Sequence, residues 1–309
     1  MVKTWLTERF GLDVPVVLAP MAGVAGGALA AAVSGAGGLG MIGWGGGPAE
    51  DLRAHLDLAR AGGRPFGVGL LAWTLPRQED VVDAVLEAAP ALVSISYGDY
   101  ARYVDRFHRA GIVVTTQAGT LDDAFAAVDA GVDVVVARGG EGGGHGRDRV
   151  ATLPLLQAVL DAVDVPVLAA GGIGTARGVA AVLAAGAAGA WVGTAFTACV
   201  EAMNPPAARQ AVVAADLHDT VYTTVLDMAR GVPWPSEFGG RAIRTAYSDT
   251  WHGREQELAA HPVPMDEPIV WAGQAAGLVR AQRTAAEVVA DLAGADAVLA
   301  EVCRRTTGG

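Results

Sequence analysis

Eight short apolar segments, each followed by a segment of helical character, predict an α/β protein whose parallel strands form a TIM (β/α)8 barrel. Three observations support this fold class. The strand candidates are almost continuously apolar, which is typical of parallel strands buried on both faces. Strands and helices alternate through the first two thirds of the chain, and glycine-rich turns follow the later strands. An open doubly wound sheet is the alternative, but eight repeated units favour the barrel.

The predicted strands lie at residues 16–20, 40–43, 66–71, 92–97, 113–118, 132–138, 166–171 and 189–194. Helices are expected near residues 23–35, 48–61, 77–89, 99–110, 120–130, 152–163 and 174–185. Thr120 and Thr152 precede two of these helices as plausible caps, because a threonine oxygen can accept a hydrogen bond from a first-turn N–H. Several predicted helices are followed by a glycine, which is common at helix C-termini. These glycines are Gly62, Gly111 and Gly131.

Residues 204–269 interrupt the alternation of strands and helices. Because the amphipathic pattern of this segment is weak, we do not expect it to bury a core alone, and we predict a helical lid packed over the strand ends. A last helix from Ala285 to about Cys303 then completes the outer layer. The predicted organisation is a barrel of residues 1–203 and 270–309 with a lid subdomain at 204–269.

Composition narrows the function classes. Hydrophobic residues make up 52% of the 309 residues, which is ample for a large core and incompatible with disorder. The formal net charge of −11 disfavours nucleic acid and anionic membrane surfaces as partners. The N-terminus has no apolar core that would indicate a signal peptide, and Cys199 and Cys303 show no metal-ligand spacing. We therefore expect a cytoplasmic protein with unpaired thiols and no bound metal.

One uncharged stretch, residues 178–200, is long enough to span a membrane. However, glycines interrupt it, and at Ala187 the pattern changes from an alanine-rich helix to AWVGTAF. A helix, a turn and a strand within a core explain this pattern better, so no membrane contact is expected.

The glycine-rich loop GGEGGGHGRD, residues 139–148, follows the predicted sixth strand. So many glycines indicate unusual backbone dihedrals or close approach to a ligand. The C-terminal ends of barrel strands carry the chemistry of this fold, and a histidine exchanges a proton near neutral pH. His145 is therefore a candidate catalytic residue, with capping of a loop carbonyl as its alternative role. Glu141 is expected to accept hydrogen bonds that order the loop.

Two further glycine-rich turns, AAGGIGTARG (169–178) and VGTAF (192–196), follow the predicted seventh and eighth strands. In TIM barrels these two loops commonly bind a phosphate. The alternative is that the glycines only permit tight packing between strand and helix. No acidic residue follows about 20 positions later on a clear strand, so a mononucleotide phosphate is favoured over a dinucleotide. The residues assigned to this site are Gly171, Gly172, Gly193 and Thr194.

The order of the motifs LAPMAG, GGEGGGH, AAGGI and VGTAF, followed by GGRAIRTAYSD (239–249) and AGQAAGLV (272–279), resembles the nitronate monooxygenases, formerly called 2-nitropropane dioxygenases. The resemblance covers nearly the whole chain. It implies a TIM barrel with non-covalently bound FMN. The family oxidises alkyl nitronates, and its relatives include FMN-dependent enoyl-ACP reductases and NAD(P)H:quinone reductases.

The resemblance also implies roles for individual residues. Gln117 would reach the polar edge of the flavin, and His145 would be the catalytic base near its reactive face. The FMN phosphate would be held by Gly171, Gly172, Gly193 and Thr194. The isoalloxazine would be lined by Ala19, Pro20 and Met21, and the loop backbone at Gly143 and Gly144 would lie close to FMN.

The chain departs from the family pattern at two places. Many members carry a flavin-contacting asparagine where this chain has Gly69, and the residues after the histidine are Gly146, Arg147 and Asp148. Arg147 and Asp148 either form a surface ion pair or alter the charge preference for the substrate.

The other histidines have structural interpretations. His55, His108 and His218 are expected in helices, whereas His252 and His261 fall in the lid.

The predicted reaction is FMN-dependent oxidation of alkyl nitronates by O2 to carbonyl compounds and nitrite, with His145 as base. Alternatives are an FMN-dependent NAD(P)H reductase of enoyl thioesters or quinones, and a flavin-free phosphate-binding isomerase or aldolase. A homodimer is compatible with the sequence, which does not fix the oligomeric state.

Overall fold

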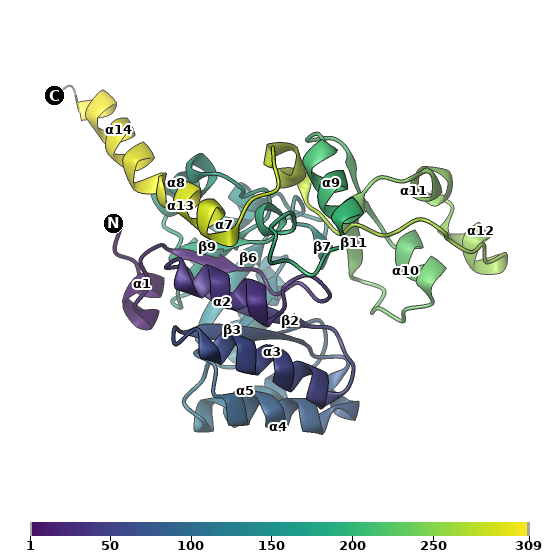
Figure 1. Ribbon diagram of the computed structural model, residues 1–309, viewed down its shortest axis with the longest axis horizontal. Coiled ribbons are helices and arrows are strands. Elements are labelled where there is room, and N and C mark those ends of the chain that lie inside the picture. The colour runs from purple at the N-terminus through teal and green to yellow at the C-terminus, as the bar shows by residue number, and fades with distance from the viewer. Residues whose placement is uncertain (1, 308–309) are drawn as a thin grey trace.

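The computed structural model describes residues 2–307 and contains the predicted barrel (Figure 1). Eight parallel strands pair in the order β1-β9-β8-β6-β5-β4-β3-β2. A parallel bridge between Val17 and Leu39 joins the two ends of this sheet, with the Leu18 N–H donating to the Leu39 carbonyl at 2.9 Å. The strands are β1 (Val16–Leu18), β2 (Gly40–Trp44), β3 (Phe66–Leu71), β4 (Leu92–Ser96), β5 (Val113–Ala118), β6 (Val134–Arg138), β8 (Val167–Ala170) and β9 (Gly189–Val192).

Helices cover the outside of the barrel and begin near the predicted positions. Thr120 caps α6, with its Oγ1 accepting from the Asp123 N–H, whereas Thr152 is not a cap. Instead Thr152 is the first residue of α7, and its N–H donates to Glu141. The helices are α2 (Gly27–Gly35), α3 (Ala49–Ala61), α4 (Glu79–Ala88), α5 (Ala101–Arg109), α6 (Leu121–Asp129), α7 (Thr152–Ala162) and α8 (Ala176–Ala184), with a short 3-10 turn η1 (Leu75–Arg77).

A short helix that the sequence analysis did not predict, α1 (Trp5–Phe10), packs at the N-terminal end of the barrel. Its Leu6 and Phe10 form one apolar cluster with strand residues that include Met41 and Trp191. Burying such side chains stabilises the fold by about 1.5–3 kcal/mol each. This end of the barrel is therefore filled with apolar side chains, which leaves the opposite end for chemistry.

The lid segment is not wholly helical, contrary to expectation. Two of its strands form an antiparallel sheet of order β10-β11-β7 with β7 (Gly144–Gly146) from the glycine-rich loop, in which β11 is the central strand. These strands have three to five residues each, and β7 and β11 contain glycines, so the sequence shows no clear alternation. The lid comprises α9 (Pro206–Ala214), β10 (Thr220–Thr223), α10 (Val225–Arg230), β11 (Gly239–Ile243), α11 (Ala246–Trp251) and α12 (Glu255–Ala260).

Two smaller expectations are also corrected. The last helix is divided at Gly294 into α13 (Ala285–Ala293) and α14 (Ala295–Thr307), and His218 lies in a turn before β10 rather than in a helix. Two more 3-10 turns are η2 (Thr194–Phe196) and η3 (Gln274–Leu278). In Figure 1, α10–α12 lie far from α14, on the opposite side of the molecule.

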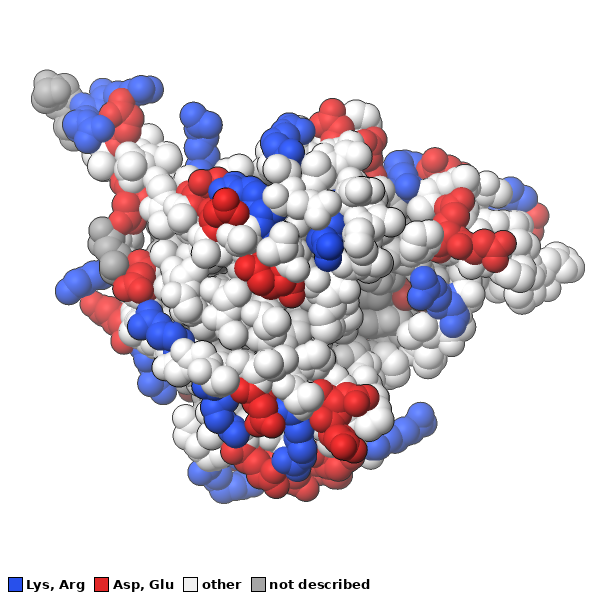
Figure 2. Space-filling model, viewed as in Figure 1, with Lys and Arg blue, Asp and Glu red and all other residues white. Residues whose placement is uncertain are grey.

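The surface bears both signs of charge. On the face shown in Figure 2, acidic and basic side chains lie among one another near the edges, and the centre is largely uncharged. Helix α2, which lies on this face, contains no charged residue. Within residues 2–307, none of the helices is both long enough and apolar enough to cross a membrane.

Candidate functional site

A cavity of about 400 Å³ lies where the C-terminal ends of the barrel strands meet the lid. The site residues predicted from the sequence come together around it, although they come from distant parts of the chain. Those that line the cavity are Ala19, Pro20, Met21, Gln117, Gly143, Gly144, His145, Gly171, Gly172, Gly193 and Thr194. His252 and His261 are exposed and are not among the lining residues.

The loop after β1 packs tightly on the glycines of the neighbouring strands. A Cβ atom at Gly69 would lie 2.3 Å from the Cβ of Pro20, and one at Gly43 would lie 2.3 Å from the Met21 nitrogen. Two carbon atoms cannot approach so closely in a packed interior. A side chain at position 69 would therefore force Pro20 out of its observed position. The glycine at position 69 is therefore coupled to the path of this loop.

Arg138 at the end of β6 holds the glycine-rich loop. Its buried guanidinium donates from Nη2 to the carbonyls of Gly142, Gly143 and Gly144, at 2.9, 3.1 and 3.1 Å. Burial lowers the pKa of Arg138. A Cβ atom at Gly146 would lie 2.2 Å from Nη1 of this guanidinium. The glycines thus allow the backbone to wrap around a buried cation.

We expect Arg138→Lys to lower the free energy of unfolding by about 1.5–3 kcal/mol, which is the usual contribution of a hydrogen bond to a charged group. The reason is that a lysine ammonium cannot reproduce the planar fork of donors that a guanidinium presents. Urea unfolding would measure the change. Arg149→Lys, at an exposed position directly after the loop, is the matched control and should change stability little. Equal stability of the two variants would contradict this role of Arg138.

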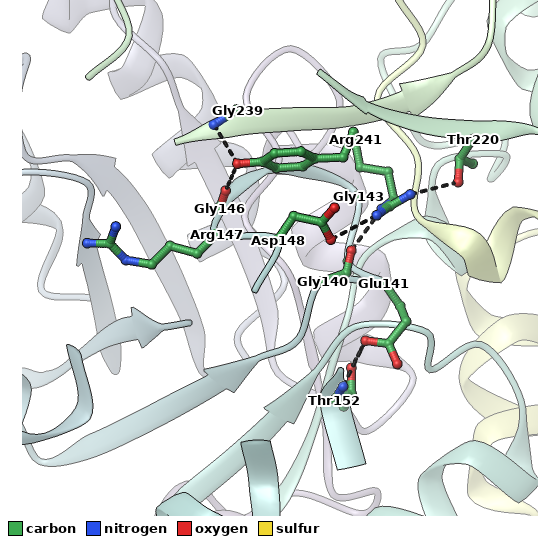
Figure 3. Close-up of polar contacts among 12 residues, drawn as sticks. Gly140, Glu141, Gly143, Gly146, Arg147, Asp148, Thr152, Thr220, Gly239 and Arg241 are labelled. Carbon is green, nitrogen blue, oxygen red and sulfur yellow. Dashed lines mark hydrogen bonds and ion pairs between the residues drawn. The ribbon is translucent and has the colours of Figure 1, made fainter. Parts of the chain in front are cut away.

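Further polar contacts fix the loop to the barrel and to the lid (Figure 3). Glu141 orders the loop as predicted, since its Oε2 accepts from the N–H and the hydroxyl of Thr152 at 2.8 and 2.7 Å. Arg241 on β11 donates to the Gly140 carbonyl at 2.8 Å and to Asp148 at 3.0 Å. The lid is thereby attached to the loop by a buried arginine.

One of the two sequence interpretations expected an ion pair between Arg147 and Asp148. The structure shows instead that each residue pairs with another partner. Arg147 pairs with Asp123 at 2.8 Å and its guanidinium lies 4.9 Å from the ring centre of Phe238, while Asp148 pairs with Arg241. Each charge is therefore used to join the loop to a different element. Neither residue lines the main cavity.

His145 is held on several sides by residues that the sequence analysis did not single out. Its Nε2 lies 2.9 Å from Oδ2 of Asp227 on α10, and its ring stacks on Trp234 with centroids 3.6 Å apart and planes 7° apart. Trp271 lies 4.6 Å away at 51°. The His145 carbonyl accepts a hydrogen bond from the Tyr97 hydroxyl at 2.9 Å.

Tyr97 follows β4 and has a φ of 68°, in the left-handed region that costs energy for a bulky residue. Burial raises the pKa of Tyr97, which keeps its hydroxyl protonated as a donor. Its ring also packs on Trp234 and Phe238, with centroids 5.3 and 5.2 Å away. The strained backbone thus serves to place an aromatic ring and a donor beneath the histidine loop.

The turns after β8 and β9 present unpaired backbone donors to the cavity. Gly171 and Gly172 have φ values of 110° and 70°. Among residues 2–307, no protein acceptor is found for the N–H groups of Gly171, Gly172 or Thr194. Unpaired N–H groups in turns between a strand and a helix are suited to bind an anion. The hydroxyl oxygen of Thr194 accepts from the Gly273 N–H at 2.9 Å and still has its own proton to donate.

Aromatic residues form the other part of the cavity wall: Trp73, Tyr97, Trp191, Trp234 and Trp271. Nε1 of Trp73 is buried and has no acceptor in the described part of the chain. Arg230, exposed on α10, also lines the cavity, and no ion pair with it is found within residues 2–307. The cavity thus combines backbone donors at one part of its wall with aromatic rings and a cation at another.

Comparison with known proteins gives consistent results. A family model described as nitronate monooxygenase matches residues 3–84 and 72–294. A nitronate monooxygenase of Paraburkholderia phytofirmans is 32% identical, over 94% of each chain. The structure of FabK from Thermotoga maritima superposes with a TM-score of 0.85 at 29% identity, covering 100% of this chain and 99% of the other. A nitroalkane oxidase from Streptomyces ansochromogenes gives 0.79 at 30% identity, with 98% and 99% covered.

Proposed function

The chain belongs to the nitronate monooxygenase family, a family of flavin-dependent oxidoreductases, and on this premise we propose that it oxidises alkyl nitronates with O2 to carbonyl compounds and nitrite, with FMN as its flavin. The observation that carries the proposal is His145, which borders a cavity lined by every residue assigned to flavin binding. The similarity to a nitroalkane oxidase supports the same reaction class.

The residues around the cavity fit a flavin mononucleotide. The N–H groups of Gly171, Gly172 and Thr194, which lack protein acceptors in the described chain, would hold its phosphate. Ala19, Pro20 and Met21 would line the ring system, with the backbone at Gly143 and Gly144 close by and Gln117 at its polar edge. When bound, FMN would supply the electron transfer and the oxygen chemistry.

His145 would act on a neutral nitroalkane as the base that removes the proton next to the nitro group. The C–H bond breaks, its electron pair remains on the substrate as the nitronate, and the proton passes to the imidazole. A preformed nitronate needs no such step, and His145 would then only position it. The aromatic rings of Trp234 and Trp271 would exclude water from this region.

The lid would define the substrate end of the site. We assign residues 1–203 and 270–309 to the flavin-binding barrel and residues 204–269 to the part that shapes the substrate pocket. Asp227, Arg230 and Trp234 all come from that segment and line the cavity. Variation in the lid would therefore change the substrate more than the cofactor.

The exposed guanidinium of Arg230 would attract the nitronate anion. We expect Arg230→Gln to raise KM for a nitronate several-fold at low ionic strength, and to change KM for the neutral nitroalkane little. Because the charge is exposed, the difference should fade as salt shortens the Debye length to about 3 Å at 1 M. Steady-state oxygen uptake at two salt concentrations would measure it, and a salt-independent KM would count against an electrostatic role.

Anaerobic mixing tests the proposed reaction directly. The FMN-loaded protein should lose its flavin absorbance at about 450 nm when it is mixed with a nitronate. Rapid bleaching by NADH or NADPH, without bleaching by a nitronate, would favour the reductase alternative. A colourless protein that FMN cannot reconstitute would favour the flavin-free barrel instead.

A further inference from the structure

Asp227 is a buried carboxylate on the lid whose side chain points at His145. Its exposed fraction is 7%, and the side chains of both residues are 10% exposed. The His145 ring nitrogen Nε2 lies 2.9 Å from Oδ2 of Asp227. Within residues 2–307, no other hydrogen bond or ion pair involves this carboxylate, so its one described polar contact is the histidine. Since a buried charge without a partner is costly, this contact accounts for the place of Asp227.

The histidine ring has little freedom to turn away from this carboxylate. Trp234 covers one face at 3.6 Å and Trp271 lies against it at 4.6 Å. The His145 backbone is paired with Gly240 in β11, and its carbonyl is bonded to Tyr97. Backbone and ring are therefore fixed independently, and the remaining variable is which ring nitrogen carries the proton.

We propose that Asp227 is a positioning residue that selects the tautomer of His145. The carboxylate accepts the proton of Nε2, and the neutral imidazole then has its lone pair on Nδ1. Nδ1 is accordingly the atom that accepts the substrate proton. This inference rests on the proposed function of His145 as a base.

The same contact balances charge during proton abstraction. Once Nδ1 has accepted the proton, both ring nitrogens carry hydrogen and the ring is an imidazolium beside the Asp227 carboxylate. The other ionisable groups nearby are Tyr97 on the loop after β4, Arg138 on β6 and Arg230 on α10. Of these, none can supply the negative charge, because Tyr97 remains protonated and the other two are cations. Asp227 is therefore the group suited to stabilise the product of the proton transfer.

The test combines nitrogen NMR with kinetics on the FMN-loaded protein and its Asp227→Asn variant. With ¹⁵N-labelled histidine, and His145→Asn to assign the signal, the wild-type protein should show a protonated Nε2 and an unprotonated Nδ1 when the ring is neutral. An asparagine amide can donate to Nε2 as well as accept from it, so the variant should show the opposite tautomer or a mixture. Turnover of a neutral nitroalkane should fall about 100-fold, the lower range for a lost acid–base function, with KM little changed and the preformed nitronate much less affected.

Controls separate a positioning role from a structural one. Asp266→Asn removes an exposed lid carboxylate and should leave both tautomer and turnover unchanged. Asp227→Glu keeps the carboxylate acceptor, so it should retain the wild-type tautomer and recover part of the activity. This variant keeps the test decisive when the asparagine variant folds poorly. An unchanged tautomer in Asp227→Asn, with or without lost activity, would overturn the proposal. If the wild-type protein does not act on nitroalkanes, the proposed function fails, and the NMR result still decides the role of Asp227.

Discussion

Replacing His145 with asparagine is expected to lower turnover of a neutral nitroalkane by about 10²- to 10⁴-fold, the usual contribution of a general base. The reason lies in the geometry around the ring. His145 is the histidine that lines the cavity, and its imidazole is held by Asp227 and Trp234. Asparagine retains a polar side chain but cannot accept a proton at working pH. Oxygen uptake with the nitroalkane and with its preformed nitronate would measure both reactions.

The comparison of the two substrates makes this prediction specific. The nitronate is already deprotonated, so its oxidation by His145→Asn should fall far less than that of the nitroalkane. His252→Asn is the matched control, because that histidine is exposed in the lid and outside the cavity. If the nitroalkane is turned over at the wild-type rate by a variant with normal flavin content, the base assignment is wrong.

Replacing Gly171 with alanine is expected to weaken FMN binding by about tenfold. The residue has a φ of 110°, and an added Cβ would lie 2.6 Å from the Thr152 hydroxyl and 3.0 Å from the Gly139 carbonyl. Strain of this kind costs on the order of 1–3 kcal/mol, and about 1.4 kcal/mol corresponds to a factor of ten in affinity. Relief of the strain would turn the unpaired N–H groups of this turn away from the phosphate. Fluorescence titration of the flavin-free protein with FMN would give the dissociation constant.

Gly35→Ala provides the control for this substitution. Gly35 lies at the end of α2 with nothing within 4 Å of an added Cβ, so alanine there should leave FMN affinity unchanged. Alanine is also the better helix former by up to about 1 kcal/mol. A Gly171→Ala protein with the Tm and FMN affinity of the wild type would argue against the phosphate site.

The barrel could be predicted from sequence because its determinants are local. An apolar run such as VVVAR at 134–138 becomes a buried strand, and a cap such as Thr120 begins the next helix. Glycines that follow the strands then place the candidate site, since all strands of such a barrel end on one face. The missed helix α1 also had local signals, because Thr4 caps its start and Gly11, with a φ of 65°, ends it.

The part of the site that the lid contributes could not be predicted in the same way. The contact between His145 and Asp227 joins positions 82 residues apart, and nothing in the spacing of the two residues indicates it. Trp234 lies in a segment without periodicity, and its stacking on His145 depends on the path of the lid. The strands β7, β10 and β11 are short, and β11 pairs with both of the others. Tertiary pairing, which a single sequence does not display, decides these features.

The pairing of β7 with β11 has a consequence for protein engineering. Gly144 to Gly146 are in register with Arg241 to Gly239, and the Tyr222 hydroxyl bridges the Gly146 carbonyl and the Gly239 N–H at 2.8 Å each. A chimera that imports the lid of a relative therefore also replaces main-chain partners of the glycine-rich loop. Exchange of substrate range by transplanting residues 204–269 should succeed only when the donor segment preserves this register and a hydroxyl at position 222. The natural unit of exchange is thus the lid together with the loop.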